Sequence, residues 1–170
     1  MENYGDRIAG HCISLPIQRE NVASQRFEGE LPINTHIEGC VHPPCLLPQL
    51  QDVVVHIVFR APRTMTDMRT LATAFVPTGP IVLPVPYPLG DDAFTCNFLT
   101  NSFCPVLEGE VLAYTLRMHI ESFFPADTVA TLEFRIVDEN NNPVICIRVG
   151  IRIMPPVNSI TSEMKTNLLN

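Results

Sequence analysis

Hydrophobic and polar residues alternate with a period of two along much of this chain, which is the pattern of β-strands with one buried face. The alternation is clearest in residues 52–61, 111–122, 131–139 and 144–154. Helical periodicity is nearly absent, so the chain is predicted to be all-β. The side chains predicted to face inward are Val53, Val55, Ile57, Phe59, Leu112, Tyr114, Leu116, Met118, Ile120, Leu132, Phe134, Ile136, Ile145, Ile147, Val149, Ile151 and Ile153.

Turn-forming residues separate these stretches. Residues 138–143, DENNNP, connect two predicted strands and are typical of a hairpin. A further strand is expected within residues 70–76, and shorter ones within 7–17 and 31–39. Half a dozen or more strands, each with one apolar face, bury those faces by packing as two sheets. The predicted fold class is therefore an all-β, two-sheet sandwich.

Prolines recur through residues 80–90, PIVLPVPYPLG, among the most strand-like side chains of the sequence. A proline has no N–H to donate to a sheet, so this segment cannot be a fully paired central strand. It is predicted to be a stiff, extended edge strand or the rim of an apolar opening.

Composition limits the classes of protein to consider. The 170 residues suffice for one domain with a substantial core, and 46% are hydrophobic against 17% charged, which excludes a disordered chain. No apolar run approaches the ~20 residues that a membrane helix needs. The net charge is −7 and lysine and arginine form no cluster, which excludes binding to nucleic acid.

Six cysteines, at positions 12, 40, 45, 96, 104 and 146, favour a secreted or luminal protein, because disulfides form in oxidising compartments. The first residues, MENYGDRIAGHC, show neither the basic nor the apolar region of a signal peptide. We give the cysteine pattern more weight than the absence of this signal.

Two histidines and two cysteines lie close together in the segment THIEGCVHPPC and invite comparison with a zinc site: His36, Cys40, His42 and Cys45. The segment lacks a Cys-x-x-Cys knuckle, and two consecutive prolines between the cysteines stiffen it. A short-loop disulfide between the cysteines is the preferred interpretation, and no metal is predicted.

Motifs of catalysis are missing from the sequence, which has no Gly-x-Ser-x-Gly elbow, no His-Glu-x-x-His and no glycine-rich phosphate loop. His11, His56 and His119 fall on outward faces or in the irregular start, where a solvated histidine is the ordinary interpretation. No enzyme activity and no catalytic residue is predicted. Aromatic side chains instead gather near turns, in residues 93–104 and 121–127, where they either plug a core or line an open mouth.

A set of motifs follows one order along residues 39–154: a Cys-x4-Cys pair at 40 and 45, LPVPYP at 83–88, a cysteine loop from Cys96 to Cys104-Pro105, a strand containing Tyr114, Asp138-Glu139-Asn140 and Cys146. In order and spacing they resemble the ML (MD-2-related lipid-recognition) family, and most closely its Niemann-Pick type C2 branch. The resemblance implies an immunoglobulin-like sandwich whose two sheets splay apart around an apolar cavity for a sterol or another lipid.

The same resemblance implies three disulfides, Cys12–Cys146, Cys40–Cys45 and Cys96–Cys104. Tyr87, Ile120 and Phe124 match the positions that line the mouth in sterol-binding relatives. Tyr87 stands where the family more often has phenylalanine, and its hydroxyl is expected at the mouth, facing either a polar ligand head or solvent. The complete set expected to line the lipid pocket is Phe59, Val76, Val85, Tyr87, Tyr114, Ile120, Phe124 and Phe134.

The function implied is that of a non-enzymatic carrier that binds and transports a sterol, without any cofactor besides the bound lipid. Its expected partners are a sterol or fatty-acid-like lipid, a membrane sterol transporter as acceptor and, transiently, a membrane, in the extracellular space or the lysosomal lumen. Residues 1–38 would hold a first strand and an extended loop, 39–154 the ML domain, which Cys12 joins, and 155–170 a tail. The alternatives are a carrier of fatty acids or semiochemicals, an innate-immune sensor of microbial lipids, and an immunoglobulin-like interaction module with a filled core.

Overall fold

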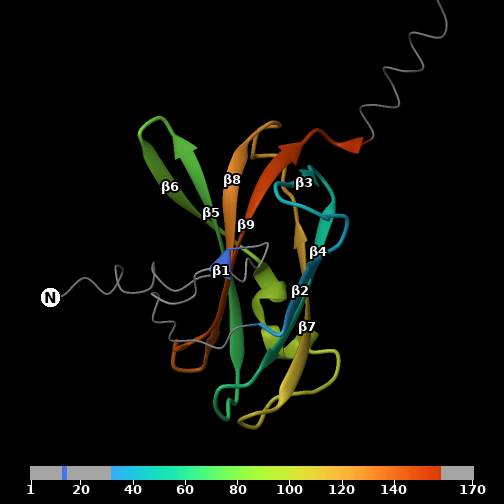
Figure 1. Ribbon diagram of the computed structural model, residues 1–170, viewed down its shortest axis with the longest axis vertical. Helices are drawn as coiled ribbons and strands as arrows, with labels where there is room; N and C mark the ends of the chain where they lie inside the picture. Colours follow the sequence, from blue (N-terminus) through green and yellow to red (C-terminus); the bar gives the residue numbers. More distant parts are fainter. Residues whose placement is uncertain (1–12, 15–31, 158–170) are drawn as a thin grey trace, which may run out of the picture.

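Two β-sheets pack face to face in the computed structural model, which describes residues 13–14 and 32–157 (Figure 1). Sheet A has the strand order β1 (Ile13–Ser14), β9 (Pro143–Met154), β8 (Val129–Asp138), β5 (Met68–Thr78) and β6 (Ile81–Tyr87), and β3 (Cys45–Pro48) also pairs with β9. Sheet B consists of β2 (Asn34–Ile37), β4 (Asp52–Arg60) and β7 (Val111–His119). Two short 3₁₀ helices, Gly90–Ala93 and Thr95–Phe98, lie between β6 and β7. The predicted all-β, immunoglobulin-like sandwich is confirmed.

Neighbouring strands are antiparallel, except on one side of β9. There its first half pairs in parallel with β1 and its second half pairs in parallel with β3. β8 and β9 form the predicted hairpin. Its turn includes Asn141 at φ 60°, a left-handed conformation that asparagine tolerates better than most residues.

The core between the sheets is formed by the alternating residues that the sequence pattern predicts. Every side chain predicted to face inward from β4, β7, β8 and β9 is buried, as is Ile120 just beyond the end of β7. Burial of these aliphatic and aromatic side chains is the main force that holds the sandwich together, because each contributes roughly 1.5–3 kcal/mol when fully removed from water.

One residue on the outer face of sheet A departs from the simple alternation. Glu133 of β8 is only 4% exposed although it points away from the core. Its carboxylate lies 2.7 Å from Nε of Arg148 and 3.1 Å from Nε of Arg135, and the Arg148 guanidinium lies over the ring of Phe75. These charged partners offset the free-energy cost of removing the Glu133 carboxylate from water.

Disulfides fasten two of the segments that connect the strands. Cys40–Cys45 and Cys96–Cys104 are formed as predicted, with Cα–Cα distances of 5.2 and 5.7 Å. The first of these bonds uses both thiols of the segment that resembled a zinc site, so the disulfide interpretation is correct. Cys146 is also disulfide-bonded. Its predicted partner, Cys12, lies outside the described residues, and the Cys12–Cys146 pairing stays a prediction.

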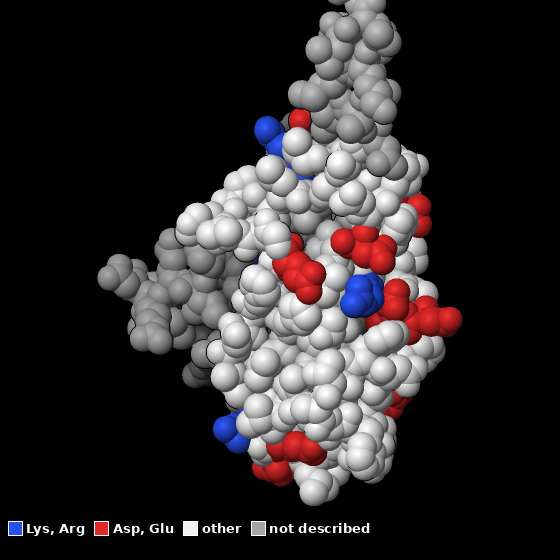
Figure 2. Space-filling model, turned by 90° about the vertical axis from the view of Figure 1, so that its right-hand side faces the viewer, with Lys and Arg blue, Asp and Glu red and all other residues white. Residues whose placement is uncertain are grey.

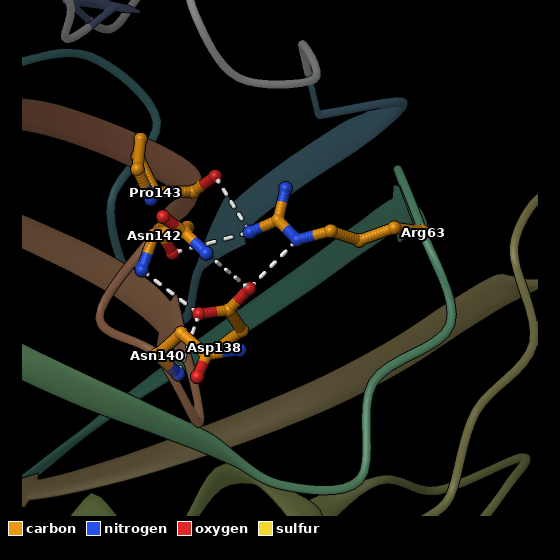
Figure 3. Close-up of polar contacts among 5 residues, drawn as sticks. All are labelled: Arg63, Asp138, Asn140, Asn142 and Pro143. Carbon is orange, nitrogen blue, oxygen red and sulfur yellow. Dashed lines mark hydrogen bonds and ion pairs between the residues drawn. The ribbon is translucent and has the colours of Figure 1, made fainter.

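A buried carboxylate organises the end of the sandwich at the β8–β9 hairpin (Figure 3). Asp138 accepts hydrogen bonds from the backbone N–H groups of Asn140 and Asn142, at 2.9 and 2.8 Å, and from the Asn142 side chain at 3.1 Å. Nε of Arg63 lies 2.7 Å from the same carboxylate, and the Arg63 guanidinium also donates to the carbonyls of Asn142 and Pro143. This cluster joins the loop after β4 to the hairpin.

The predicted domain boundaries can be followed only in part. Residues 1–12, 15–31 and 158–170 lie outside the described residues, so the extended loop of the N-terminal region and most of the predicted tail stay predictions. The predicted first strand corresponds in part to β1. In the described ranges, no helix is both long and apolar enough to cross a membrane.

Candidate functional site

A small apolar cavity lies between the two sheets, near the end where β7 and β9 finish and β8 begins. Its volume is about 20 Å³, close to the space that one water molecule occupies. Its lining comes from both sheets and from the loop between β7 and β8: Ala74, Tyr87, Met118, Ile120, Phe124, Thr128, Ala130, Ile151 and Ile153. None of these side chains is charged, and Thr128 carries the only hydroxyl besides that of Tyr87.

Small side chains on two central strands leave this space open. Ala74 of β5 and Ala130 of β8 face the interior and are 3% and 5% exposed. Deeper in the sandwich, the corresponding inward positions of β8 carry leucine, phenylalanine and isoleucine, which fill the gap between the sheets. Along β8, the cavity therefore reflects a local change from large to small inward residues.

Three aromatic rings lie at the mouth of the cavity and narrow its opening to solvent. The ring of Tyr87 lies 5.9 Å from the ring of Phe123 and 5.9 Å from that of Phe124, nearly parallel to both. The rings of Phe123 and Phe124 are 4.5 Å apart. Phe123 is 58% exposed, whereas Phe124 is half-buried and lines the cavity. The aromatic loop predicted from the sequence is thus a lid over an apolar space.

The Tyr87 hydroxyl is turned away from solvent, toward backbone groups at the edge of sheet B. It donates a hydrogen bond to the backbone carbonyl of His119 and accepts one from the backbone N–H of Glu121 at 2.9 Å. Burial raises the pKa of this hydroxyl, and the Glu121 amide partly offsets that effect, so the group stays protonated and able to donate. Since β6 belongs to sheet A and β7 to sheet B, the hydroxyl joins the edges of the two sheets.

The β7–β8 loop is fastened from a second side by Gln49. Its side-chain amide donates to the carbonyl of Phe124 at 2.6 Å and to that of Ser122 at 3.4 Å. The backbone N–H of Leu50 donates to the carbonyl of Ile120 at 2.7 Å. The lid therefore lies between two anchors, the β3–β4 turn and Tyr87.

The β5–β6 hairpin projects from the body of the sandwich (Figure 1). Val76, Leu83 and Val85 share the inner face with Ala74 and Tyr87, because Ala74 pairs with Val85 and Val76 with Leu83. Leu83 is 44% exposed, and Val76 and Val85 are half-buried. The inner face of sheet A therefore reaches past the cavity.

Prolines protect the outer edge of this hairpin. β6 is the last strand of sheet A, as the sequence predicted, and it pairs with β5 along its whole length. Pro84 and Pro86 alternate with the residues whose N–H groups face β5, so their ring nitrogens face the free edge. Donors are thus missing where a further strand would pair.

The predicted pocket residues fall into three groups. Tyr87, Ile120 and Phe124 are brought together in the lining. Val76 and Val85 lie beside it on the exposed hairpin. Phe59, Tyr114 and Phe134 are at most 1% exposed and pack in the core outside the lining. The hydroxyl of Tyr114 hydrogen-bonds to Thr70 at 2.8 Å, and burial raises its pKa to about 12, only partly offset by the hydroxyls of Thr70 and Thr95.

Six lining residues were not in the predicted pocket set: Ala74, Met118, Thr128, Ala130, Ile151 and Ile153. Met118, Ile151 and Ile153 were predicted to face inward, but the alternation pattern does not distinguish a cavity wall from a filled core. The available signal was Ala130, a small residue in the otherwise bulky inward row of β8.

These features define a class of protein: an immunoglobulin-like β-sandwich with an apolar cavity between its sheets. The chain belongs to the ML domain family, whose model matches residues 29–153, and it has the lipid-binding fold of that family. A search of solved structures found a Niemann-Pick type C2 protein from the Japanese carpenter ant, with a TM-score of 0.62 and 16% identity over 74% of this chain and 93% of that chain. It also found chicken MD-1 complexed with lipid IVa, with a TM-score of 0.42 and 16% identity over 66% of this chain and 75% of that one. A comparison with curated protein sequences gave no significant match.

Proposed function

We propose that this protein binds a sterol, or a neutral lipid of similar shape, between its two sheets and carries it without chemical change. The observation that carries the proposal is the cavity lining, which is apolar, comes from both sheets and includes all three mouth positions, Tyr87, Ile120 and Phe124. Burying ~400 Å² of ligand surface contributes about 10 kcal/mol before the costs of association and ordering. Micromolar or tighter binding is compatible with that balance.

The charges around the mouth favour a ligand with a neutral head group. The β7–β8 loop carries Glu121 and Asp127 but no lysine or arginine. The side of the molecule seen in Figure 2 carries scattered acidic side chains and few basic ones. A fatty-acid carboxylate or a lipid phosphate would lie near like charge, without the arginine or lysine that normally binds it. A sterol hydroxyl is uncharged and needs no cationic partner at this position.

Ligand uptake requires the lid to move. Pockets for small molecules usually measure about 300–1,000 Å³, far above the 20 Å³ of this cavity. Phe123 of the lid is exposed, and so are Ile81 and Leu83 on the same strand as Tyr87, and together they form an apolar rim. We infer that this rim touches a membrane transiently, and that the lipid then passes to an acceptor such as a membrane sterol transporter. The disulfides suit the proposed location, the extracellular space or the lysosomal lumen.

The first test is mass spectrometry of lipids extracted from the protein after secretion from eukaryotic cells, followed by titration of the delipidated protein with a fluorescent sterol. A dominant co-purified sterol and saturable binding support the proposal. Co-purified fatty acids, with no competition between them and the fluorescent sterol, contradict it in favour of a general lipid carrier. A stable protein that carries no lipid and binds none contradicts it in favour of an interaction module.

A further inference from the structure

We propose that the Tyr87 hydroxyl is a latch that holds the cavity in its narrow form and sets the rate at which a ligand gains access to it. The inference rests on the proposed lipid-binding function and adds to it a residue that controls exchange. It concerns the hydroxyl group alone, because the ring would line the cavity equally well in a phenylalanine.

The two hydrogen bonds of this hydroxyl end on backbone groups at the end of β7, in the other sheet, and in the loop that follows it. His119 is the last residue of β7, and Glu121 begins the loop that carries the lid. A side chain of the β6 edge thus fixes the position of main chain on both sides of Ile120, a cavity residue. For the edges of the two sheets to part at this point, both bonds must break.

The same side chain connects the latch to the lid. The Tyr87 ring packs against Phe123 and Phe124, so displacement of the ring removes the surface on which both phenylalanines rest. Gln49 holds the opposite side of the loop through the Phe124 carbonyl. Release at Tyr87 therefore lets the lid swing about the Gln49 anchor, which exposes Ile120 and Met118 behind it.

Met118 provides a reporter of opening that needs no ligand. It lines the cavity and is 2% exposed, whereas Met65 and Met68 are equally buried but lie outside the lining. Oxidation of a methionine sulfur by hydrogen peroxide requires access to it. Peptide mass spectrometry of the delipidated protein therefore measures opening at the mouth through Met118 and opening of the core through Met65 and Met68.

The experiment compares the wild type with Tyr87→Phe, and uses Thr70→Val as the matched control. Thr70 of β5 also has a buried hydroxyl, which hydrogen-bonds to Tyr114 of β7 and to Thr95 of the second 3₁₀ helix, but it does not line the cavity. We expect Tyr87→Phe to raise the Met118 oxidation rate, and the association rate of a fluorescent sterol in stopped-flow measurements, by about fivefold to tenfold. Thr70→Val should leave both rates within about twofold of the wild type.

The other outcomes test the latch and the proposed function separately. Unchanged Met118 oxidation overturns the latch. Faster oxidation of all three methionines also overturns it, because the hydroxyl then stabilises the whole fold. Faster Met118 oxidation in a protein that binds no sterol supports the latch and contradicts sterol binding. Sterol binding at an unchanged rate, despite faster Met118 oxidation, overturns the claim that the latch limits access.

Discussion

The Nε atom of Arg63 lies 2.7 Å from a carboxylate oxygen of Asp138, and the side chain of Asp138 is 2% exposed. The partners of this carboxylate come from the loop after β4 and from the β8–β9 hairpin (Figure 3). Asp138→Asn replaces a charged acceptor with an amide that must turn its NH₂ toward N–H donors. We expect the free energy of unfolding, measured with urea, to fall by about 2–4 kcal/mol. Asn140→Ala, which keeps its backbone N–H, is the control and should change it by less than about 1 kcal/mol.

The same carboxylate should make stability depend on pH in the acid range. Burial raises the pKa of Asp138, but the hydrogen bonds from Asn142, Arg63 and Asn140 outweigh it and hold the pKa below its ordinary value of 3.8. Because the folded state then binds this proton less readily than the unfolded state, the stabilisation is complete well above about pH 4 and decreases as the pH falls through the lowered pKa. Urea unfolding between about pH 6 and 2 should show a weaker acid dependence in Asp138→Asn than in the wild type. Parallel curves would contradict this assignment.

The sequence predicted most of the fold and only part of the site, for a physical reason. Alternation identified the inward residues of β4, β7, β8 and β9, because burial of one face determines strand register. The prolines identified β6 as an edge, because a missing N–H is a local property. The hydrogen bonds of Tyr87, in contrast, depend on where β6 and β7 meet, which local sequence does not encode. The cavity itself depends on packing between the sheets, and so Phe59 and Phe134 could not be separated from Ile120.

Phe124→Ala should weaken binding of a fluorescent sterol by about tenfold or more, because loss of about 60 Å² of apolar contact costs roughly 1.5 kcal/mol. Phe124 is half-buried over a cavity, so the fold should lose little stability, less than about 1.5 kcal/mol. Phe103→Ala is the control, since Phe103 is 79% exposed and its loop lies near Val111, at the other end of β7. If Phe124→Ala instead lowers the free energy of unfolding by about 3–5 kcal/mol and leaves sterol binding unchanged, the result would favour a filled core.

Ala130→Val should reduce sterol affinity by about fivefold by adding two methyl-sized groups to the wall of a cavity of about 20 Å³. Valine suits a β-strand and the cavity accepts part of its volume. The free energy of unfolding, measured with urea, should therefore change by less than about 1.5 kcal/mol. Ala113→Val makes the same change on β7 at a position that points away from the cavity, and it should leave affinity unchanged. Equal affinity in the wild type and Ala130→Val would show that the ligand lies elsewhere.

Replacing both Pro84 and Pro86 with valine should promote association between molecules. The prolines occupy the positions of β6 whose backbone nitrogens face the free edge of sheet A, and valine would restore an N–H at each of them. An edge with regularly spaced donors and exposed Ile81 and Val82 is a template for strand addition, whereas pairing to β5 is unaffected. Light scattering after size-exclusion chromatography should show a concentration-dependent shift to larger species than in the wild type. The control is Pro88→Val, just beyond the end of β6, which should show no such shift. If the double variant also shows no shift to larger species, side chains rather than missing N–H donors protect this edge.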